Sequence, residues 1–133
     1  MTLSGKIPFN SRLISVEIET EGEKIKRIKG IEDGNYPLIL PGFIDVHTHG
    51  GGGMDVNHIE SMEDVERLSS FYASHGVTSV QLSLVTDTEE SMVKCLKVLG
   101  EAREKKLKGA QLVGIHLEGP FLSDEYKGSM PSE

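Results

Sequence analysis

Three short apolar runs, separated by two amphipathic helical segments, restrict the fold of this chain more than any other feature. The runs cover residues 38–46, 77–85 and 111–117. Their hydrophobicity is continuous rather than alternating, which is typical of parallel strands buried on both faces. Strands joined through helices of this length are parallel and have right-handed crossovers. The pattern therefore predicts an α/β fold from residue 38 onwards.

Capping residues mark the ends of the two helices. Ser61, with Asp64 three residues later, is typical of a helix start, and Gly76 is typical of a helix stop. Thr86 with Glu89 has the same spacing and predicts the start of the second helix. Each helix is expected to pack its apolar stripe against the sheet.

The segment before residue 38 has a different pattern. Val16, Ile18 and Thr20 alternate with glutamates, Gly22 follows in a turn, and isoleucines return among lysines and arginines up to residue 31. Alternation with a period of two indicates a strand with one buried face. Residues 14–31 are therefore predicted to form a β-hairpin.

Two histidines follow the first apolar run directly. In an extended segment His47 and His49 are two residues apart, so both rings point to the same side, as does Asp45. Two imidazoles at the end of a strand can bind one divalent metal, and Asp45 could orient a ligand or help to hold the site. The alternative is a surface loop that happens to contain two histidines.

The third apolar run ends in a similar pair, because His116 and Glu118 share one side of the strand. A glutamate after a buried apolar strand is costly unless it is paired or bound to a cation. Since the carboxyl ends of parallel strands share one edge, Glu118 is a candidate metal ligand together with His47 and His49. The alternative is an exposed glutamate bonded to loop amides.

Substrate contacts are expected in two loops. Glycines let the backbone approach a ligand closely, so Gly50 and Gly51 in the run Gly50–Gly53 are candidates for substrate binding, although such a run is also typical of a flexible turn. Lys127 could meet an anion, and the alternative is an ordinary surface lysine. The glycine run has no phosphate-loop pattern.

Composition narrows the class of protein. The 133 residues suffice for one ordinary domain, and 14 basic against 21 acidic side chains give a net charge of −7 without a basic cluster. This balance argues against a nucleic-acid partner or an anionic membrane surface. No apolar run approaches a membrane span or the core of a signal peptide. The single Cys95 excludes an internal disulfide, and a cytoplasmic location is expected.

Two motifs resemble a known family. The run Leu40-Pro-Gly-Phe-Ile-Asp-Val-His-Thr-His-Gly50 resembles the first-strand motif of the amidohydrolase superfamily. The run Val113-Gly-Ile-His-Leu-Glu-Gly-Pro-Phe121, followed by Lys127-Gly128, is similar to the N-acetylglucosamine-6-phosphate deacetylases. The second motif is the more specific, because the H-x-H pair is common to many amidohydrolases.

The resemblance implies an architecture and a reaction. Residues 1–37 would be the N-terminal part of a small β-sandwich, and residues 38–133 the first β/α units, with the first three strands, of an incomplete metal-dependent TIM-like (β/α)₈ barrel. The reaction would release acetate from N-acetylglucosamine 6-phosphate to give glucosamine 6-phosphate in amino-sugar catabolism. One or two divalent ions, zinc or iron, would activate the water. Glu118 matches the family's metal-ligand glutamate, and His47 and His49 match the pair found in two-metal members.

The resemblance also has departures and further implications. Met130 stands where the family has a histidine that contacts substrate, and its thioether cannot replace that hydrogen bond. A complete barrel needs roughly 250 residues, so the catalytic aspartate and two further metal-binding histidines are expected beyond Glu133. The chain alone is therefore expected to be inactive, and its full-length parent to be a dimer.

Two other functions remain open from the residues. A cyclic-amide hydrolase of the same superfamily, such as a dihydroorotase-like enzyme, would share His47 and His49, although the segment 116–120 argues against it. A non-catalytic metal-binding or oligomerising short chain would have to cover the open edge of its third strand by self-association.

Overall fold

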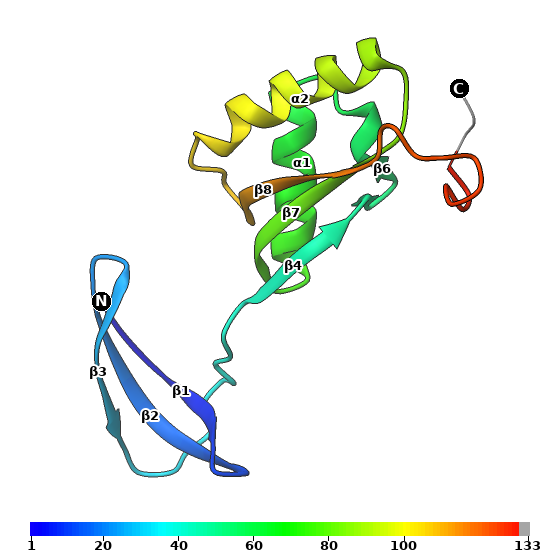
Figure 1. Ribbon diagram of the computed structural model, residues 1–133. Helices are drawn as coiled ribbons and strands as arrows, with labels where there is room; N and C mark the ends of the chain where they lie inside the picture. Colours follow the sequence, from blue (N-terminus) through cyan, green and yellow to red (C-terminus); the bar gives the residue numbers. More distant parts are fainter. Residues whose placement is uncertain (131–133) are drawn as a thin grey trace. The chain divides into compact units, whose positions relative to one another are not determined.

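The computed structural model describes residues 1–130 and divides into two compact units, Met1–Pro41 and the residues from Gly42 onwards (Figure 1). The first unit is a sheet of three antiparallel strands, β1 (Thr2–Phe9), β2 (Arg12–Glu21) and β3 (Lys24–Gly30), in the order β1-β2-β3. Strands β2 and β3 confirm the predicted hairpin, whereas β1 was not predicted.

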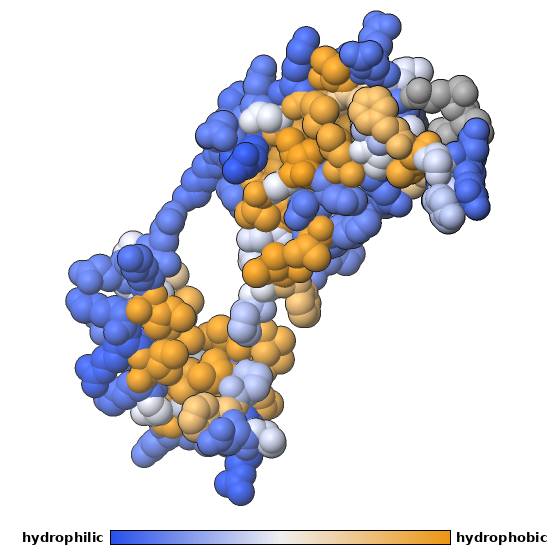
Figure 2. Space-filling view, in the orientation of Figure 1, coloured by the Kyte–Doolittle hydropathy of each residue, from blue (hydrophilic) through white to orange (hydrophobic). Residues whose placement is uncertain are grey.

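One face of this small sheet is apolar. Val16 and Ile18 of β2 are buried, and Figure 2 shows further apolar side chains gathered on this unit. They line a shallow groove of about 320 Å³, formed by Ile7, Pro8, Ile18, Ile25, Ile28, Ile39, Leu40 and Pro41. Strand β2 therefore has one buried apolar face, as its alternating sequence predicts.

The second unit alternates strands and helices. Its elements are β4 (Phe43–Thr48), β5 (Gly50–Gly51), β6 (Met54–Asp55), the 3-10 turn η1 (Val56–His58), α1 (Met62–Ser74), β7 (Val77–Val85), α2 (Glu89–Arg103) and β8 (Gln111–Glu118). Strands β4, β7 and β8 form a parallel sheet in that order, and both helices cover the same face of it (Figure 1). The predicted α/β fold is confirmed for this unit.

The core of the second unit lies between the sheet and the two helices. It is formed by buried side chains from both layers, including Leu68, Leu82, Leu84, Leu99 and Leu112. Cys95 belongs to this core, and burial raises the pKa of its thiol to about 11, as expected of a packing residue rather than a nucleophile. None of the helices within residues 1–130 is long and apolar enough to cross a lipid bilayer.

Strand β4 differs from its prediction. The apolar run begins at residue 38, but the strand begins at Phe43, after Pro41, which has no backbone N–H to donate to a ladder. Phe43, Ile44 and Val46 are 63%, 67% and 64% exposed, so β4 is not buried on both faces. The reason is its position at the edge of the sheet, where β7 is its neighbour on one side.

The two helices begin at different kinds of cap. The predicted capping box is present at α1, where the Ser61 hydroxyl accepts from the Asp64 N–H and Asp64 accepts from the Ser61 N–H. The predicted box at Thr86 is wrong, because Thr88 caps α2 by accepting from the Ser91 N–H. The Thr86 hydroxyl instead donates to the Glu118 carbonyl at 3.1 Å and joins the ends of β7 and β8.

The α1 cap leads to a stability prediction. Ser61→Ala removes the acceptor for the Asp64 N–H, and we expect the free energy of unfolding to fall by about 1 kcal/mol. Urea denaturation followed by circular dichroism measures the change. Ser70→Ala, at an exposed position of the same helix, is the matched control and should leave stability within ~0.5 kcal/mol. Equal losses in both variants would contradict a role for the cap.

Candidate metal centre

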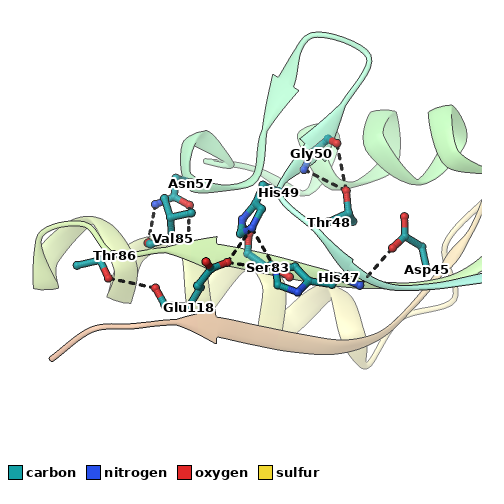
Figure 3. Close-up of polar contacts among 10 residues, drawn as sticks. All are labelled: Asp45, His47, Thr48, His49, Gly50, Asn57, Ser83, Val85, Thr86 and Glu118. Carbon is teal, nitrogen blue, oxygen red and sulfur yellow. Dashed lines mark hydrogen bonds and ion pairs between the residues drawn. The ribbon is translucent and has the colours of Figure 1, made fainter. Parts of the chain in front are cut away.

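Three side chains from two strands converge at the carboxyl end of the parallel sheet (Figure 3). His47 is the last residue but one of β4, His49 follows the strand directly, and Glu118 is the last residue of β8. The two Nε2 atoms are 3.1 Å apart, and they lie 3.1 Å (His47) and 2.9 Å (His49) from the Glu118 Oε2 atom. The structure thus brings together the three residues that the sequence predicts as metal ligands.

The shape of this triangle fits a metal ion. Ligand atoms about 2.0–2.1 Å from a tetrahedral zinc ion lie about 3.3 Å from one another. The three observed separations are within a few tenths of an ångström of that value. Two imidazoles and a carboxylate are also a donor set that suits first-row divalent metals. The three side chains are 50%, 40% and 37% exposed, so the triangle is open to solvent on one side.

A backbone carbonyl of the neighbouring strand fixes the orientation of the His49 ring. Its Nδ1 lies 3.0 Å from the backbone carbonyl oxygen of Ser83 on the central strand β7. A carbonyl can only accept, so Nδ1 carries the proton and Nε2 keeps its lone pair facing the triangle. Metal-binding histidines usually donate their other ring N–H to a carbonyl or carboxylate in this way, which fixes the tautomer and the ring orientation.

Side-chain hydrogen bonds of Asn57 and Thr86 hold the end of β7 near the centre. The Asn57 side chain donates to the Val85 carbonyl and accepts from the Val85 N–H, each at 3.0 Å. Thr86 donates to the carbonyl of Glu118. The three strand ends are therefore joined by side-chain hydrogen bonds as well as by the sheet ladder (Figure 3).

Asp45 acts on the backbone of β4. Its Oδ1 accepts from the His47 N–H at 3.2 Å, so it helps to hold this segment, one of the two roles that the sequence allowed. In the same segment, the Tyr72 hydroxyl of α1 lies 2.6 Å from Thr48 Oγ1 and donates to the Gly50 carbonyl at 2.9 Å. Burial raises the pKa of Tyr72, which keeps this donor protonated at neutral pH.

The glycine run is a tight hairpin rather than an open loop. Gly50 and Gly51 form β5, which pairs with β6. Gly50 has a φ of +131°, and a Cβ on Gly51 would collide with the Phe71 ring. Both glycines directly follow the histidine pair, where a larger residue would not fit.

Lys127 lies in the loop after β8. Its Nζ is 3.6 Å from the Asp124 Oδ1, and its side chain is 20% exposed. The Met130 N–H donates to the Lys127 carbonyl at 3.2 Å.

The structure adds residues around the centre that were not among the predicted ligands. His116 shares its side of β8 with Glu118, as the spacing predicts, and its ring centroid is 4.6 Å from that of His47. His47, His116 and Glu118 offer ligand atoms within 4.8 Å of one another. Tyr72 and Ser83 had no sequence signal, because their roles depend on packing between elements. His58 and His75 are exposed.

A comparison with family models matches residues 38–131 to the amidohydrolase family. The chain belongs to the amidohydrolase family. This amidohydrolase is 35% identical over 133 residues to the N-acetylglucosamine-6-phosphate deacetylase of Bacillus subtilis (strain 168), covering 98% of the chain and 33% of that protein. It is 32% identical over 93 residues to an N-acetylgalactosamine-6-phosphate deacetylase of Shewanella sp. (strain ANA-3), covering 70% of the chain and 23% of that protein.

A solved structure gives the same result. The N-acetylglucosamine-6-phosphate deacetylase of Pasteurella multocida superposes with a TM-score of 0.76 at 27% identity, over 98% of this amidohydrolase and 38% of that chain. The chain thus spans about a third of the length of the relatives that match it over nearly its whole extent.

Proposed function

We propose that this chain supplies part of the active site of an N-acetylglucosamine-6-phosphate deacetylase, which releases acetate and leaves glucosamine 6-phosphate. The observation that carries the proposal is the triangle of donor atoms from His47, His49 and Glu118, 2.9–3.1 Å apart at the carboxyl end of a parallel sheet. Catalytic sites of parallel α/β folds gather at that edge. The names of the relatives supply the substrate.

The proposed cofactor is zinc or iron, as one or two ions. When bound, such an ion supplies Lewis-acid activation of a water molecule for attack on the acetamide carbonyl. His47, His49 and Glu118 hold it, and the Ser83 carbonyl keeps His49 in the metal-binding tautomer. The proposal assigns the general acid–base step to an aspartate outside residues 1–130.

The proposed substrate contacts are the backbone of Gly50 and Gly51 and the ammonium group of Lys127. The glycines follow His49 directly, so a ligand at the ion would lie close to their backbone. Lys127 is paired with Asp124 at 3.6 Å, and a phosphate group would compete for that ammonium. With Met130 in place of the family's histidine, the sugar is held without an imidazole at that position.

The proposed architecture is the first part of a (β/α)₈ barrel. The parallel order β4-β7-β8, with α1 and α2 on one face, fits two successive β/α units of such a barrel followed by a third strand. The first unit, with its apolar groove, is proposed to belong to a small β-sandwich.

N-acetylgalactosamine 6-phosphate is a second candidate substrate, because a relative that is 32% identical is named for it. The two sugars differ in the orientation of one ring hydroxyl, so the same ion and the same amide chemistry serve both. A cyclic amide is the third candidate substrate, and the test below includes it.

A chimaera tests the proposal. Residues 1–130 of this chain replace the aligned segment of the Bacillus subtilis relative. Acetate release is measured with both amino-sugar phosphates, and ring opening is measured with a cyclic amide such as dihydroorotate. We expect turnover of N-acetylglucosamine 6-phosphate at an ordinary enzymatic rate, on the order of 1–10³ s⁻¹, and a loss of at least ~100-fold with Glu118→Gln. The 133-residue chain alone should show no turnover.

His58→Asn is the matched control for the chimaera, because His58 is an exposed histidine outside the triangle. It should leave turnover unchanged. A folded chimaera that binds zinc but hydrolyses none of the three substrates would favour the non-catalytic metal-binding alternative. Turnover of the cyclic amide alone would replace the proposed substrate.

A further inference from the structure

Two buried polar atoms beneath the metal centre have no partner. Among the described residues 1–130, Ser83 Oγ and His116 Nδ1 are buried and make no hydrogen bond. Ser83 is completely buried. Leaving such a group unsatisfied costs about 1–3 kcal/mol. An ion or a water molecule bound beside the group is one explanation of such an atom in a native protein.

The two residues that carry these atoms are neighbours on adjacent strands. Ser83 and His116 are directly paired in the parallel register of β7 and β8, so their side chains lie on the same face of the sheet. That face also carries Glu118, two residues beyond His116. The carbonyl of Ser83 already accepts from His49. Ser83 therefore lies between the histidines of β4 and the polar end of β8.

His116 is also close to the proposed ligands. Its ring centroid is 4.6 Å from that of His47, and one of its ring nitrogens lies within 4.8 Å of ligand atoms of His47 and Glu118. The groups here whose lone pairs could bind a ligand are a carboxylate, imidazole nitrogens and a hydroxyl oxygen. This set is rich in lone pairs and carries negative charge, so a cation satisfies it better than water does.

We propose that His116 is a further ligand of the metal centre, so that the chain supplies three imidazoles and one carboxylate to first-row divalent ions. The inference rests on the proposed metal centre and adds to its ligands His116, the register partner of Ser83. The centre then consists of two overlapping sets of ligands, His47/His49/Glu118 and His47/His116/Glu118, which share two members. The Ser83 hydroxyl lies on the same face of the sheet as His116 and Glu118 of the second set.

The first test uses the unaltered chain, which contains five histidines. The imidazole nitrogens are labelled with ¹⁵N, and their signals are followed by nuclear magnetic resonance while Zn²⁺ is added. We expect the ring signals of His47, His49 and His116 to shift together, and those of His58 and His75 to stay unchanged. This measurement does not depend on whether any variant folds.

The second test compares variants by isothermal titration calorimetry with Zn²⁺. His116→Asn should weaken binding at least ~10-fold, whereas His75→Asn, at an exposed site, should leave it unchanged. Shifts confined to His47 and His49, with His116→Asn binding as tightly as the unaltered chain, would overturn the inference and leave the proposed centre intact. If no ring signal shifts, both the centre and this extension are wrong.

Discussion

Replacing Glu118 by glutamine should weaken the binding of Zn²⁺ by at least ~100-fold. The change keeps the shape of the side chain but removes the charge that faces two imidazole Nε2 atoms at 3.1 and 2.9 Å. Substitutions behind a metal ligand already cost 10–100-fold in affinity, and Glu118 is proposed to touch the ion itself. A neutral amide is also a poorer ligand than a carboxylate for divalent ions.

The metal-free protein should tolerate the same change. Glu118 is 37% exposed, and its backbone carbonyl, which accepts from Thr86, is unaltered. Contacts between half-exposed charged groups contribute little to stability, so the free energy of unfolding without metal should change by less than ~1 kcal/mol. A large effect on binding with a small effect on folding separates a ligand from a structural residue.

Calorimetry and thermal unfolding together measure the effect. At a free Zn²⁺ concentration of 100 times the dissociation constant of the unaltered chain, binding stabilises the folded chain by about 2.7 kcal/mol, and at the same concentration this gain should fall to about 0.4 kcal/mol or less in Glu118→Gln. Glu101→Gln, an exposed position on α2, is the matched control and should keep both the affinity and the gain. Unchanged affinity in Glu118→Gln would exclude the triangle as the site of the ion.

The convergence of His47, His49 and Glu118 was predictable because each position depends on local spacing. His47 and His49 are two residues apart in the extended segment that ends β4, which predicts that both rings lie on one side. Glu118 ends another strand of the same parallel sheet, and the carboxyl ends of such strands share one edge. Sequence periodicity alone therefore predicts that three side chains from two distant segments lie close together.

The support of the centre was not predictable in the same way. The Ser83 carbonyl that orients His49, and the Tyr72 hydroxyl that reaches Thr48, act across elements whose packing no local pattern encodes. Thr86 shows the same limit. Its spacing to Glu89 predicts a cap, but its hydroxyl makes a tertiary bond to Glu118, and Thr88 takes over the cap.

Leu84→Ala should have the largest effect on folding. Leu84 is completely buried on the central strand β7, in the core between the sheet and the helices. Removing its three outer carbons leaves a cavity, and such changes cost 2–5 kcal/mol, a large part of the ~5–15 kcal/mol by which a domain is stable. We expect the urea midpoint to fall accordingly while the m-value stays constant.

The chain contains a matched control for this change. Leu117 is the register partner of Leu84 on β8 but is 42% exposed, so Leu117→Ala removes the same atoms from a site that is only partly packed. Its loss should stay below ~1.5 kcal/mol, because less apolar surface returns to water and solvent fills the space. Equal losses would mean that strand pairing, rather than packing of β7 under the helices, dominates. Since Ser83 and Val85 flank Leu84 and are the register partners of His116 and Glu118, the packing beneath β7 also holds the candidate metal centre in place.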